Sequence, residues 1–455
     1  MPRRSWAARR PFPCQECRAE QSLSEKPTAA ANPDARATSA RRMGTRARPI
    51  LAIFSPISCA LGWLGVLGAV GALACSEAAP QGFAPYAGDA YPNRRARFEA
   101  NGHTLGYVAN RFSDSITVLD LDTMQTLGTA PVGRDPADTD GPRHILLDEP
   151  HGLAYVALTY PLEVRSPHVV MEGAPERASY VQALALDDLR VMGEVRLDTS
   201  ADEMAFSPAA GSLVVSHRDP LKGLSLTPTP LVWIDEPWRM SDNTVTQRRL
   251  SPCVAPGSLA WDRSSALVYV ACTGEDKLGV IDAQTTPRVL EFVASGMDVV
   301  NQPYAVVADE SGPRLLVSNQ VAQKVAVFEV GSGPDSGSTQ SAARQIGSIT
   351  VSGVPGFSAF LGREALIIPQ RDPAGVLRVD AQSLEIQATS QLSSTDCENP
   401  SEARATEDGR LFLVCEGDHY SPGAVLKLDP NTLATEAKVN VGLYPDRLAV
   451  RPFSR

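Results

Sequence analysis

Two repeated features of the sequence predict an all-β chain. Short apolar strands end five times in closely similar residues: Tyr107-Val108-Ala109-Asn110, Tyr155-Val156-Ala157-Leu158, Tyr269-Val270-Ala271-Cys272, Leu316-Val317-Ser318-Asn319 and Phe412-Leu413-Val414-Cys415. Strands that close on an acidic residue recur at Asp120, Asp187, Asp235, Asp282, Glu329, Asp380 and Asp429, in steps of 67, 48, 47, 47, 51 and 49 residues. A small four-stranded sheet cannot bury its faces alone and must stack on its neighbours. The seven copies therefore predict a seven-bladed β-propeller of four-stranded antiparallel blades.

Each repeat is expected to run strand, turn, strand, polar loop, strand, turn, strand. The repeats open at Pro92, Pro142, Ala201, Pro256, Pro303, Pro355 and Pro400. A hairpin signal such as Ala100-Asn101-Gly102-His103 separates the first two strands, and an acidic turn such as Asp429-Pro430-Asn431-Thr432 separates the last two. We interpret the acidic residues as turn residues whose carboxylates accept backbone N–H groups, and not as a catalytic series.

The residues that carry the repeat also carry a family resemblance. The phrase Tyr107-Val108-Ala109-Asn110, the alternating strand over 115–120 and the return to Val132-Gly133 are similar to the YVTN-type β-propeller repeat of secreted and surface proteins. The resemblance covers about residues 92–451 and departs in units two, three and six, at Leu158, Ser216-His217 and Ile368-Pro369. It implies seven blades. Because such propellers bind, scaffold or catalyse, it implies no single function.

Eight opening strands are available for seven blades, because residues 444–450 resemble residues 91–97. Strands from both chain ends within one blade would tie the ring shut. We therefore expect residues 446–450 to form the innermost strand of the first blade, with residues 93–98 displaced or outermost.

The first 91 residues are predicted to target the chain and not to join the propeller, which we assign to residues 92–455. Residues 1–42 are rich in Arg and Ala without a strand or helix period, and we expect them to be disordered or an over-extended start. Residues 43–74 resemble a secretory signal peptide. It ends in Leu73-Ala74-Cys75, which resembles the lipobox of bacterial lipoproteins and implies acylation of Cys75 and a tether over 75–91. Plain secretory cleavage and a signal anchor are the alternatives.

The net charge of the chain limits the kinds of partner that it can bind. Residues 75–455 hold 31 basic and 48 acidic side chains, a net charge of about −17. Such a surface repels phosphate backbones, so we exclude a nucleic-acid partner. We expect a monomer in the bacterial cell envelope, secreted and held on a membrane by the lipid anchor.

Four cysteines of the propeller fall into two pairs with similar spacing. Cys253 and Cys272 are 19 residues apart, and Cys397 and Cys415 are 18 apart. In each pair the first cysteine precedes a strand and the second ends the following strand, so antiparallel pairing would bring them together. We predict two disulfides, with free core thiols as the alternative. A metal site is disfavoured because no His or second thiol stands at zinc-ligand spacing.

Ligand contacts in a propeller are expected where the blade openings and the loops between second and third strands gather on one face. This face mixes both charges with aromatic side chains, although loops of this kind are also commonly just solvated. The candidate ligand-binding residues are Arg143, His144, Glu203, His217, Tyr304, Gln370, Arg371, Glu402, His419 and Arg447. A long insertion over 159–177 is expected on the same side.

No catalytic motif identifies a reaction. The chain from residue 75 onward contains no Gly-x-Ser-x-Gly, His-Glu-x-x-His or haem-attachment motif. Residues 135–141 resemble a calcium loop, but Pro136 stands at the first ligand position, so we predict no metal and no cofactor. Two functions stay open: a binding or scaffold module for a protein or envelope ligand, or a periplasmic enzyme such as a lactonase or lyase. Histidines that converge on Glu203 or Glu402 would favour the enzyme.

Overall fold

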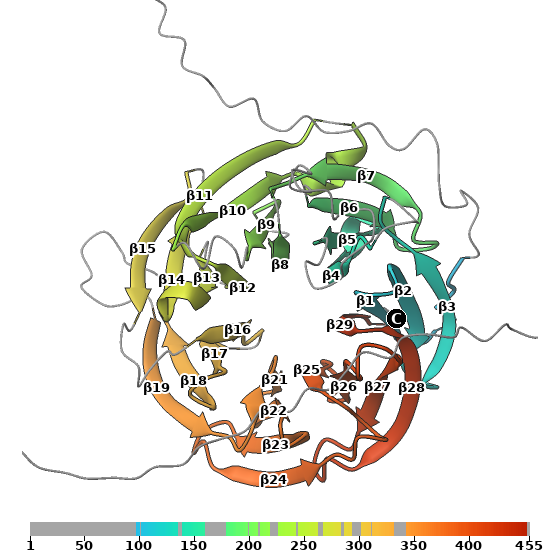
Figure 1. Cartoon of the computed structure of the whole chain (residues 1–455), viewed down its shortest axis with the longest axis vertical. Coiled ribbons are helices and arrows are strands. Elements are labelled where there is room, and N and C mark those ends of the chain that lie inside the picture. Colours follow the sequence, from blue (N-terminus) through green and yellow to red (C-terminus); the bar gives the residue numbers. More distant parts are fainter. Residues whose placement is uncertain are drawn as a thin grey trace, which may run out of the picture. The chain divides into compact units, whose positions relative to one another are not determined.

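The fold is described by a computed structural model of the chain. It describes residues 97–100, 102–134, 139–159, 179–198, 200–207, 210–218, 226–242, 244–262, 267–283, 286–293, 302–310, 312–331 and 343–452. The described residues form seven small antiparallel sheets that follow one another around a ring (Figure 1). The predicted all-β, seven-bladed propeller of four-stranded blades is confirmed.

The blades follow chain order, and each runs from an innermost to an outermost strand. Blade one contains β29 (Pro445–Arg451), β1 (Leu105–Asn110), β2 (Ser115–Asp120) and β3 (Gln125–Pro131). Blade two contains β4 (Pro142–Asp148), β5 (Leu153–Leu158), β6 (Tyr180–Ala185) and β7 (Val191–Arg196). Blade three contains β8 (Ala201–Ser207), β9 (Ser212–His217), β10 (Pro228–Asp235) and β11 (Thr246–Val254). Blade four contains β12 (Pro256–Trp261), β13 (Leu267–Cys272), β14 (Lys277–Asp282) and β15 (Arg288–Val293).

The remaining blades complete the ring. Blade five contains β16 (Pro303–Ala308), β17 (Arg314–Asn319), β18 (Lys324–Val330) and β19 (Ala343–Thr350). In blade six the innermost strand is broken into β20 (Val354–Pro355) and β21 (Ala359–Leu361), ahead of β22 (Ala365–Arg371), β23 (Gly375–Asp380) and β24 (Ile386–Gln391). Blade seven contains β25 (Pro400–Ala405), β26 (Leu411–Cys415), β27 (Pro422–Leu428) and β28 (Thr435–Leu443). Three short 3₁₀ helices, η1 (Glu149–His151), η2 (Pro237–Asp242) and η3 (Thr273–Glu275), also lie in the described part.

The ring closes as the sequence predicted. Strand β29 pairs antiparallel with β1, with Tyr107 opposite Ala449 and Val108 opposite Leu448. The C-terminal strand is therefore the innermost strand of blade one. Phe98, on the N-terminal side, lies outside any strand and donates its backbone N–H to the Asp187 carbonyl over 2.7 Å.

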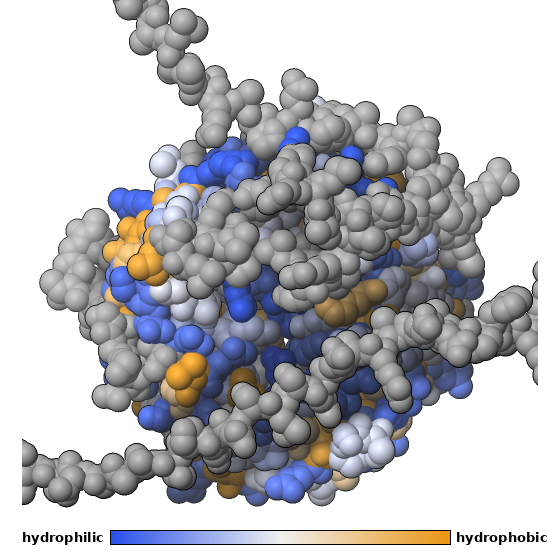
Figure 2. Space-filling model, in the orientation of Figure 1, coloured by the Kyte–Doolittle hydropathy of each residue, from blue (hydrophilic) through white to orange (hydrophobic). Residues whose placement is uncertain are grey.

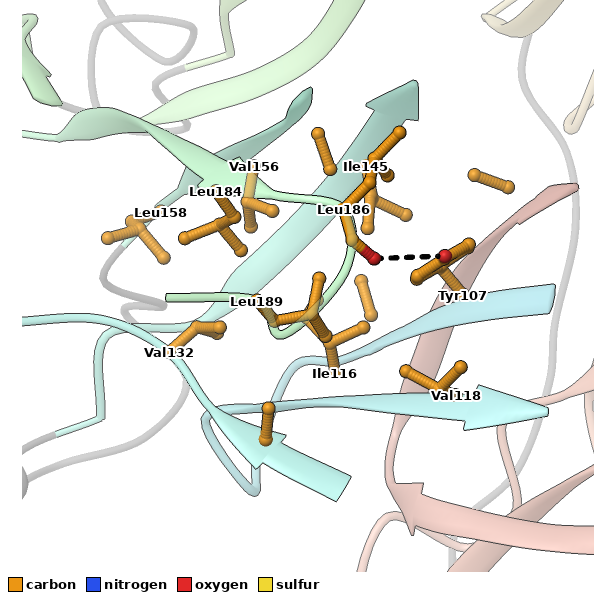
Figure 3. Packing of buried hydrophobic residues seen from close by; sticks show 14 of the residues in the cluster. Tyr107, Ile116, Val118, Val132, Ile145, Val156, Leu158, Leu184, Leu186 and Leu189 are labelled. Carbon is orange, nitrogen blue, oxygen red and sulfur yellow. Dashed lines mark hydrogen bonds between the residues drawn. The ribbon is translucent and has the colours of Figure 1, made fainter. Parts of the chain in front are cut away.

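The core lies between neighbouring blades. One cluster joins blades one and two and includes Tyr107, Ile116, Val156 and Leu186 (Figure 3). The tyrosine of the strand ending is fully buried at Tyr107, Tyr155 and Tyr269, and the Tyr107 hydroxyl donates to the Leu186 carbonyl at 3.3 Å. This bond satisfies the one polar atom of a large apolar ring, which explains why a tyrosine fits this position of the core.

Three of the seven acidic residues, Asp120, Asp380 and Asp429, cap their turns as predicted. The Asp235 carboxylate differs and bonds the side chains of Ser212, Thr246 and Arg248. Asp120 Oδ1 accepts the N–H groups of Asp122 and Thr123 at 2.9 and 3.1 Å. Asp380 and Asp429 each make the same pair of bonds to the residues two and three positions on. These carboxylates close turns between third and fourth strands.

Both predicted disulfides are confirmed, and their place in the fold differs from a bridge within one hairpin. Cys253 lies near the end of β11 in blade three, whereas Cys272 ends β13 in blade four, with their Cα atoms 5.8 Å apart. Cys397 lies in the connection from blade six to blade seven and joins Cys415 of β26 at a Cα separation of 5.2 Å. Each disulfide therefore fastens a blade-to-blade connection onto a second strand.

Six blade openings share the same backbone conformation. A residue with positive φ precedes the innermost strand at Gly141, Ser200, Ala255, Gln302, Asn399 and Tyr444. The carbonyl of each accepts the N–H of the residue that follows the second strand, at 2.9 to 3.2 Å. The register then shifts within the first residues of the innermost strand, for example between Pro142 and His144. This repeated β-bulge gathers consecutive side chains of these six openings near the axis.

Several sequence predictions fall outside the described residues. These are the extension over 1–42, the signal peptide over 43–74, the acylated Cys75, the tether over 75–91 and nearly all of the insertion over 159–177. Among the residues that are described, no helix has the length and apolar character needed to cross a bilayer.

Candidate active site

The blade openings place their second and third residues around the axis, and the charged ones gather on four consecutive blades. Blades seven, one, two and three contribute Glu402, Asp446, Arg447, Arg143, His144, Asp202 and Glu203, which we call the axial cluster. Blades four, five and six place Gly257, Ser258, Tyr304, Ala305, Gly356 and Phe357 at the same positions. Hydrophilic residues line the recessed centre of the face seen in Figure 2, around which β25, β29, β4 and β8 converge in Figure 1.

Arg447 is the centre of this cluster. Its Nη2 lies 2.5 Å from Glu203 Oε1 and its Nε 3.4 Å from Oε2, so one guanidinium holds both oxygens of the carboxyl group. The Arg447 Nη1 donates to the Asp446 carbonyl at 2.8 Å. Arg447 is 2% and Glu203 3% exposed, so this ion pair is excluded from water and its attraction is weakly screened.

A second guanidinium links two further carboxylates. Arg143 pairs through Nε with Asp202 and through Nη1 with Asp446 Oδ2, the latter at 2.9 Å. These contacts join β4 of blade two to β8 of blade three and β29 of blade one. The positive charge of Arg143 more than offsets burial and lowers the pKa of Asp202. The same carboxylates hold the pKa of Arg143 well above its usual value, against the effect of burial.

His144 and Glu203 lie in contact beside Arg447. His144 Nδ1 lies 3.1 Å from Glu203 Oε2 and accepts the backbone N–H of Met204 at 2.8 Å. Because the single lone pair of Nδ1 accepts the Met204 N–H, Nδ1 carries no proton, and its contact with Glu203 Oε2 is a close approach and not a second hydrogen bond. The neutral imidazole then bears its own proton on Nε2.

Burial and the neighbouring charges set the protonation states of Glu203 and His144. Burial raises the pKa of Glu203 to about 7; the Arg447 guanidinium opposes this rise and the charge of Asp202 supports it. Burial also raises the pKa of Glu402. Burial and the charges of Arg447, Arg404 and Arg143 lower the pKa of His144 well below its usual 6.5. A neutral histidine thus faces a carboxyl group that can gain or lose a proton near neutral pH.

Phe357 packs against Arg447. Between β20 and β21, Gly356 approaches blade seven so closely that a Cβ there would lie 2.2 Å from the Ser401 carbonyl oxygen. Phe357 can then bond to β25 through Ser401 and Ala403. This places its ring under the Arg447 guanidinium, 3.2 Å from Cζ to the ring centroid. The break in the innermost strand of blade six therefore supplies the aromatic platform for Arg447.

A second group, which we call the rim cluster, lies on the loops of the same face and consists of Arg111, Phe112, Arg371, Glu416, His419 and Tyr444. Glu416 is 1% exposed, and its Oε2 lies 3.1 Å from Arg371 Nη1 and 3.3 Å from His419 Nε2. The His419 ring stacks on Tyr444 with centroids 3.8 Å apart. Arg111 lies over the same tyrosine at 5.3 Å.

Tyr304 joins the two clusters. Its ring meets Phe357 edge to face at 5.3 Å, and its hydroxyl is hydrogen-bonded to Arg371. The guanidinium of Arg218, from the loop after β9, lies 5.5 Å from the Tyr304 ring. The rim cluster and Arg218 therefore add three arginines, each held against an aromatic ring or a buried carboxylate, to the two of the axial cluster.

The predicted site residues divide into three groups. The axial cluster contains five of them: Arg143, His144, Glu203, Glu402 and Arg447. Tyr304, Arg371 and His419 lie in or beside the rim cluster. His217 and Gln370 lie elsewhere: His217 is 1% exposed and bonds the Pro230 carbonyl at 3.0 Å, and Gln370 is 2% exposed and bonds Ser352. Both stand near the ends of second strands and bond neighbouring segments of their own blades.

Further residues join the predicted ones in the site, among them Asp202, Asp446, Glu416 and Arg404. Asp202, Asp446 and Glu416 occupy the openings and loops singled out in the sequence, but their pairing with Arg143 and Arg371 required the ring. Arg404 follows Glu402 by two residues on β25, and its charge lowers the pKa of both Glu402 and His144. Arg404 could have been predicted from Glu402, because residues two positions apart on a strand lie on the same face of the sheet.

Metal-ligating atoms of the described residues converge on the opposite face. His103, Asp120 and Asp122 bring one ligand atom each within 4.8 Å of one another. These atoms already have protein partners: Asp120 Oδ2 lies 2.7 Å from His103 Nδ1, and Asp122 Oδ2 accepts the Thr104 N–H at 2.8 Å. The two carboxylates therefore stabilise the local turn structure.

The axial arrangement suits acid–base chemistry on an anionic or polar substrate. A carboxyl group with a pKa near 7 is suited to accept and donate protons at neutral pH. Buried guanidinium groups are suited to stabilise an oxyanion, because their charge is weakly screened there.

Three solved structures with the same fold were compared with this chain. A candidate 6-phosphogluconolactonase from Bacteroides uniformis is 12% identical, with a TM-score of 0.56 over 77% of this chain and 100% of that one. A second, from Bacteroides fragilis, is 11% identical, with a TM-score of 0.54 over 78% and 99%. A periplasmic gluconolactonase from Pseudomonas aeruginosa is 12% identical, with a TM-score of 0.54 over 77% and 100%. No family model and no curated protein match the sequence. At these identities the likeness shows the fold alone.

Proposed function

We propose that the protein hydrolyses a lactone in the axial cluster. One observation carries this proposal: the buried pair of Glu203 and His144 lies against Arg447, and the pKa of Glu203 is about 7. The sequence left a binding module and a propeller enzyme open. Of the three candidate histidines, His144 lies 3.1 Å from Glu203 and supports the enzyme, whereas His217 and His419 lie away from Glu203 and Glu402.

The chemistry of lactone opening matches these groups. Water adds to the ring carbonyl, a new bond forms between carbon and the water oxygen, and the bond to the ring oxygen breaks. Glu203 takes a proton from the attacking water and returns it to the departing ring oxygen. Arg447 and Arg143 stabilise the negative charge that develops on the carbonyl oxygen. The His144 Nε2–H is an additional donor for the substrate.

The substrate class that fits best is the lactone of a sugar acid that carries an anionic group. Three arginines lie around the approach to the axial cluster: Arg111, Arg218 and Arg371. They form a positive region in a chain whose residues 75–455 carry a net charge of about −17. Guanidinium groups held on aromatic rings recognise carboxylates and phosphates with little loss of entropy. The names of the three structures with the same fold also refer to lactones of gluconic acid or its phosphate.

A matched pair of variants tests the proposal. The wild type is expected to hydrolyse glucono-δ-lactone and its 6-phosphate, and acid release is followed in a pH-stat above the spontaneous rate. Glu203→Gln is expected to lower kcat by about 10²-fold or more. Glu194→Gln is the control, because Glu194 is also buried with a raised pKa but lies on the outermost strand of blade two. Equal rates for the two variants would contradict the proposal.

A binding module is the second candidate, and the loop after β26 favours it. Tyr420 is 91% exposed, while Asp418 Oδ1 fixes the loop by accepting the N–H groups of Tyr420 and Ser421 at 2.9 and 2.7 Å. A rigid loop that exposes an aromatic ring is typical of protein recognition. A photo-reactive amino acid at Tyr420 should then capture an envelope protein. The same group at Leu127, on the outermost strand of blade one, should not.

We further propose that the protein is a monomer anchored in the bacterial cell envelope by lipid on Cys75. The two disulfides support an oxidising compartment. Mass spectrometry of the mature N-terminus should find an acylated Cys75, and Cys75→Ser should release the protein from membranes. An unmodified terminus in the wild type would contradict the anchor.

A further inference from the structure

Neighbouring blades are joined at the axis by one recurring hydrogen bond. Residues are counted from the proline or alanine that begins each blade opening. The third residue of one opening accepts the backbone N–H of the fourth residue in the next opening, and the described residues make this bond at four blade junctions. The pairs are His144 Nδ1 with Met204 at 2.8 Å, Ser258 Oγ with Val306 at 3.0 Å, the Phe357 carbonyl with Ala403 at 2.8 Å and Glu402 Oε2 with Leu448 at 2.7 Å.

The bond supplies an acceptor that the sheet does not provide. Strand β29, for example, is an innermost strand and pairs only with β1 on its outer side. The N–H of Leu448, which is 2% exposed, therefore needs an acceptor from another blade. The register of β29 against β1 shifts between Pro445 and Arg447, directly before this residue. The bond to Leu448 thus fixes the strand where its irregular segment ends.

Two of the four bonds lie directly beside the ion pair of the axial cluster. Glu203 and Arg447 are the third residues of blades three and one, and they bond each other although blade two stands between them in the ring. The residues that follow them donate their N–H groups to His144 and Glu402. Each partner of the ion pair therefore precedes a backbone position that is held by a side chain of the preceding blade.

Glu402 takes no part in the proton transfers of the proposed reaction, but it lies close to Arg447. Against the effect of burial, the charges of Glu203, Asp446 and Glu402 raise the pKa of Arg447. Burial raises the pKa of Glu402, and the charge of Arg447 opposes this rise. Both the protonated and the ionised carboxyl group offer an acceptor oxygen to a backbone N–H. Glu402 can therefore hold Leu448 in either state.

We propose that Glu402 is a positioning residue, which holds the Leu448 N–H and thereby keeps Arg447 against Glu203. Without this acceptor the N–H would be buried and unpaired, and the irregular start of β29 would shift to recover a partner. Arg447 would then lose part of its contact with Glu203, and a developing oxyanion would lose part of its stabilisation. The consequence for turnover rests on the proposed lactone hydrolysis.

Two substitutions separate the acceptor oxygen of Glu402 from its charge. Glu402→Gln keeps an oxygen at the same reach and removes the charge, so kcat is expected to stay within about threefold of the wild type. Glu402→Asp keeps the charge and withdraws the oxygen by one methylene group. Its kcat is expected to fall about tenfold or more with a nearly unchanged KM, because the weakened interaction is made mainly in the transition state. A full rate in Glu402→Asp, or a larger loss in Glu402→Gln, would overturn the role.

The titration of Glu203 gives a second result that does not depend on turnover. Burial raises the pKa of Glu203 to about 7 and Arg447 opposes this rise, so displacement of Arg447 should raise that pKa further. The other groups that face Glu203 stay unchanged in these variants; they are Asp202, Arg143, Asp446 and His144.

Urea unfolding across the pH range, with and without Glu203→Gln in each background, reports the pKa of Glu203. A rise is expected in Glu402→Asp and not in Glu402→Gln. An unshifted pKa in Glu402→Asp would overturn the positioning of Arg447. Absence of lactone hydrolysis by the wild type would overturn the proposed function, whereas this titration would still decide whether Glu402 positions Arg447.

Ser258→Ala is the matched control. Ser258 is 2% exposed and holds the Val306 N–H, so its replacement breaks the same bond between blades four and five. The third residue of blade five is Ala305, which brings no charged group to the axis. Ser258→Ala should therefore leave kcat and the pKa of Glu203 unchanged. A loss equal to that of Glu402→Asp would show a general loosening of the ring and would overturn the specific role of Glu402.

Discussion

Replacing Glu203 with glutamine removes a carboxyl group whose pKa is about 7 in the folded protein, against an ordinary value of 4.5. A raised pKa means that the folded state holds the proton more tightly than the unfolded state. The resulting stabilisation is complete below pH 4.5 and is lost as the pH rises through 7. Glutamine keeps the shape of the protonated carboxyl group and does not titrate, so this part of the pH dependence should vanish in Glu203→Gln.

The magnitude follows from the pKa difference. Each pH unit between the two values corresponds to about 1.4 kcal/mol, so the full difference is about 3 kcal/mol. His144 acts in the opposite sense: its lowered pKa gives stability that is present above pH 6.5 and is lost as the pH falls below that value. The comparison therefore uses the difference in unfolding free energy between wild type and Glu203→Gln, in which other titrations largely cancel.

Urea unfolding at intervals from pH 4 to 8 measures this difference. The wild type should lose about 3 kcal/mol relative to Glu203→Gln across the range, most of it between pH 4.5 and 7. A constant difference would refute the raised pKa. A difference that grows in favour of the wild type with pH would show that Arg447 keeps Glu203 ionised, and the assignment of Glu203 as a proton carrier would then be wrong.

Three further substitutions test the fold around the site. Arg447→Met leaves two buried carboxyl groups without their shared cation and should cost about 3–5 kcal/mol in urea unfolding, whereas a cost below about 1 kcal/mol would contradict the buried network. Replacing Cys397 and Cys415 together by serine should cost about 2–4 kcal/mol, and an unchanged unfolding midpoint would refute a stabilising disulfide. Leu448→Ala should cost about 2–5 kcal/mol, because Leu448 is 2% exposed in the closing strand, while Leu127→Ala, at a side chain 42% exposed, should change the midpoint little.

Much of the fold was predictable because its signals are local. Most blades have a recognisable strand ending and hairpin residues, and seven strands end on an acidic residue, so the number of blades could be counted from the sequence. The disulfide pairs were predicted from their spacing of 19 and 18 residues. Their place across blade-to-blade connections was not, because Pro256 and not Cys253 is the strand partner of Cys272.

The candidate site was predictable as a set of positions and not as a set of contacts. The openings that carry Arg143, Glu203 and Arg447 could be read from the repeat. Their pairing could not, since Arg447 and Glu203 are 244 residues apart and Arg143 and Asp446 are 303 apart. His217 shows the limit of assignment by loop position: it ends β9, yet its ring turns back to bond the Pro230 carbonyl in β10.

The sequence by itself determined seven repeated blades, a C-terminal strand that completes the first of them, and which residues open each blade. These features depend on strand period, turn chemistry and spacing, all of which act over a few tens of residues. Only the tertiary structure decided that four adjacent openings bury two arginines among four carboxyl groups, and that Glu203 meets His144 with a pKa of about 7. Charge pairing and the loss of water around a charge depend on which openings become neighbours, and closure of the ring fixes those neighbours.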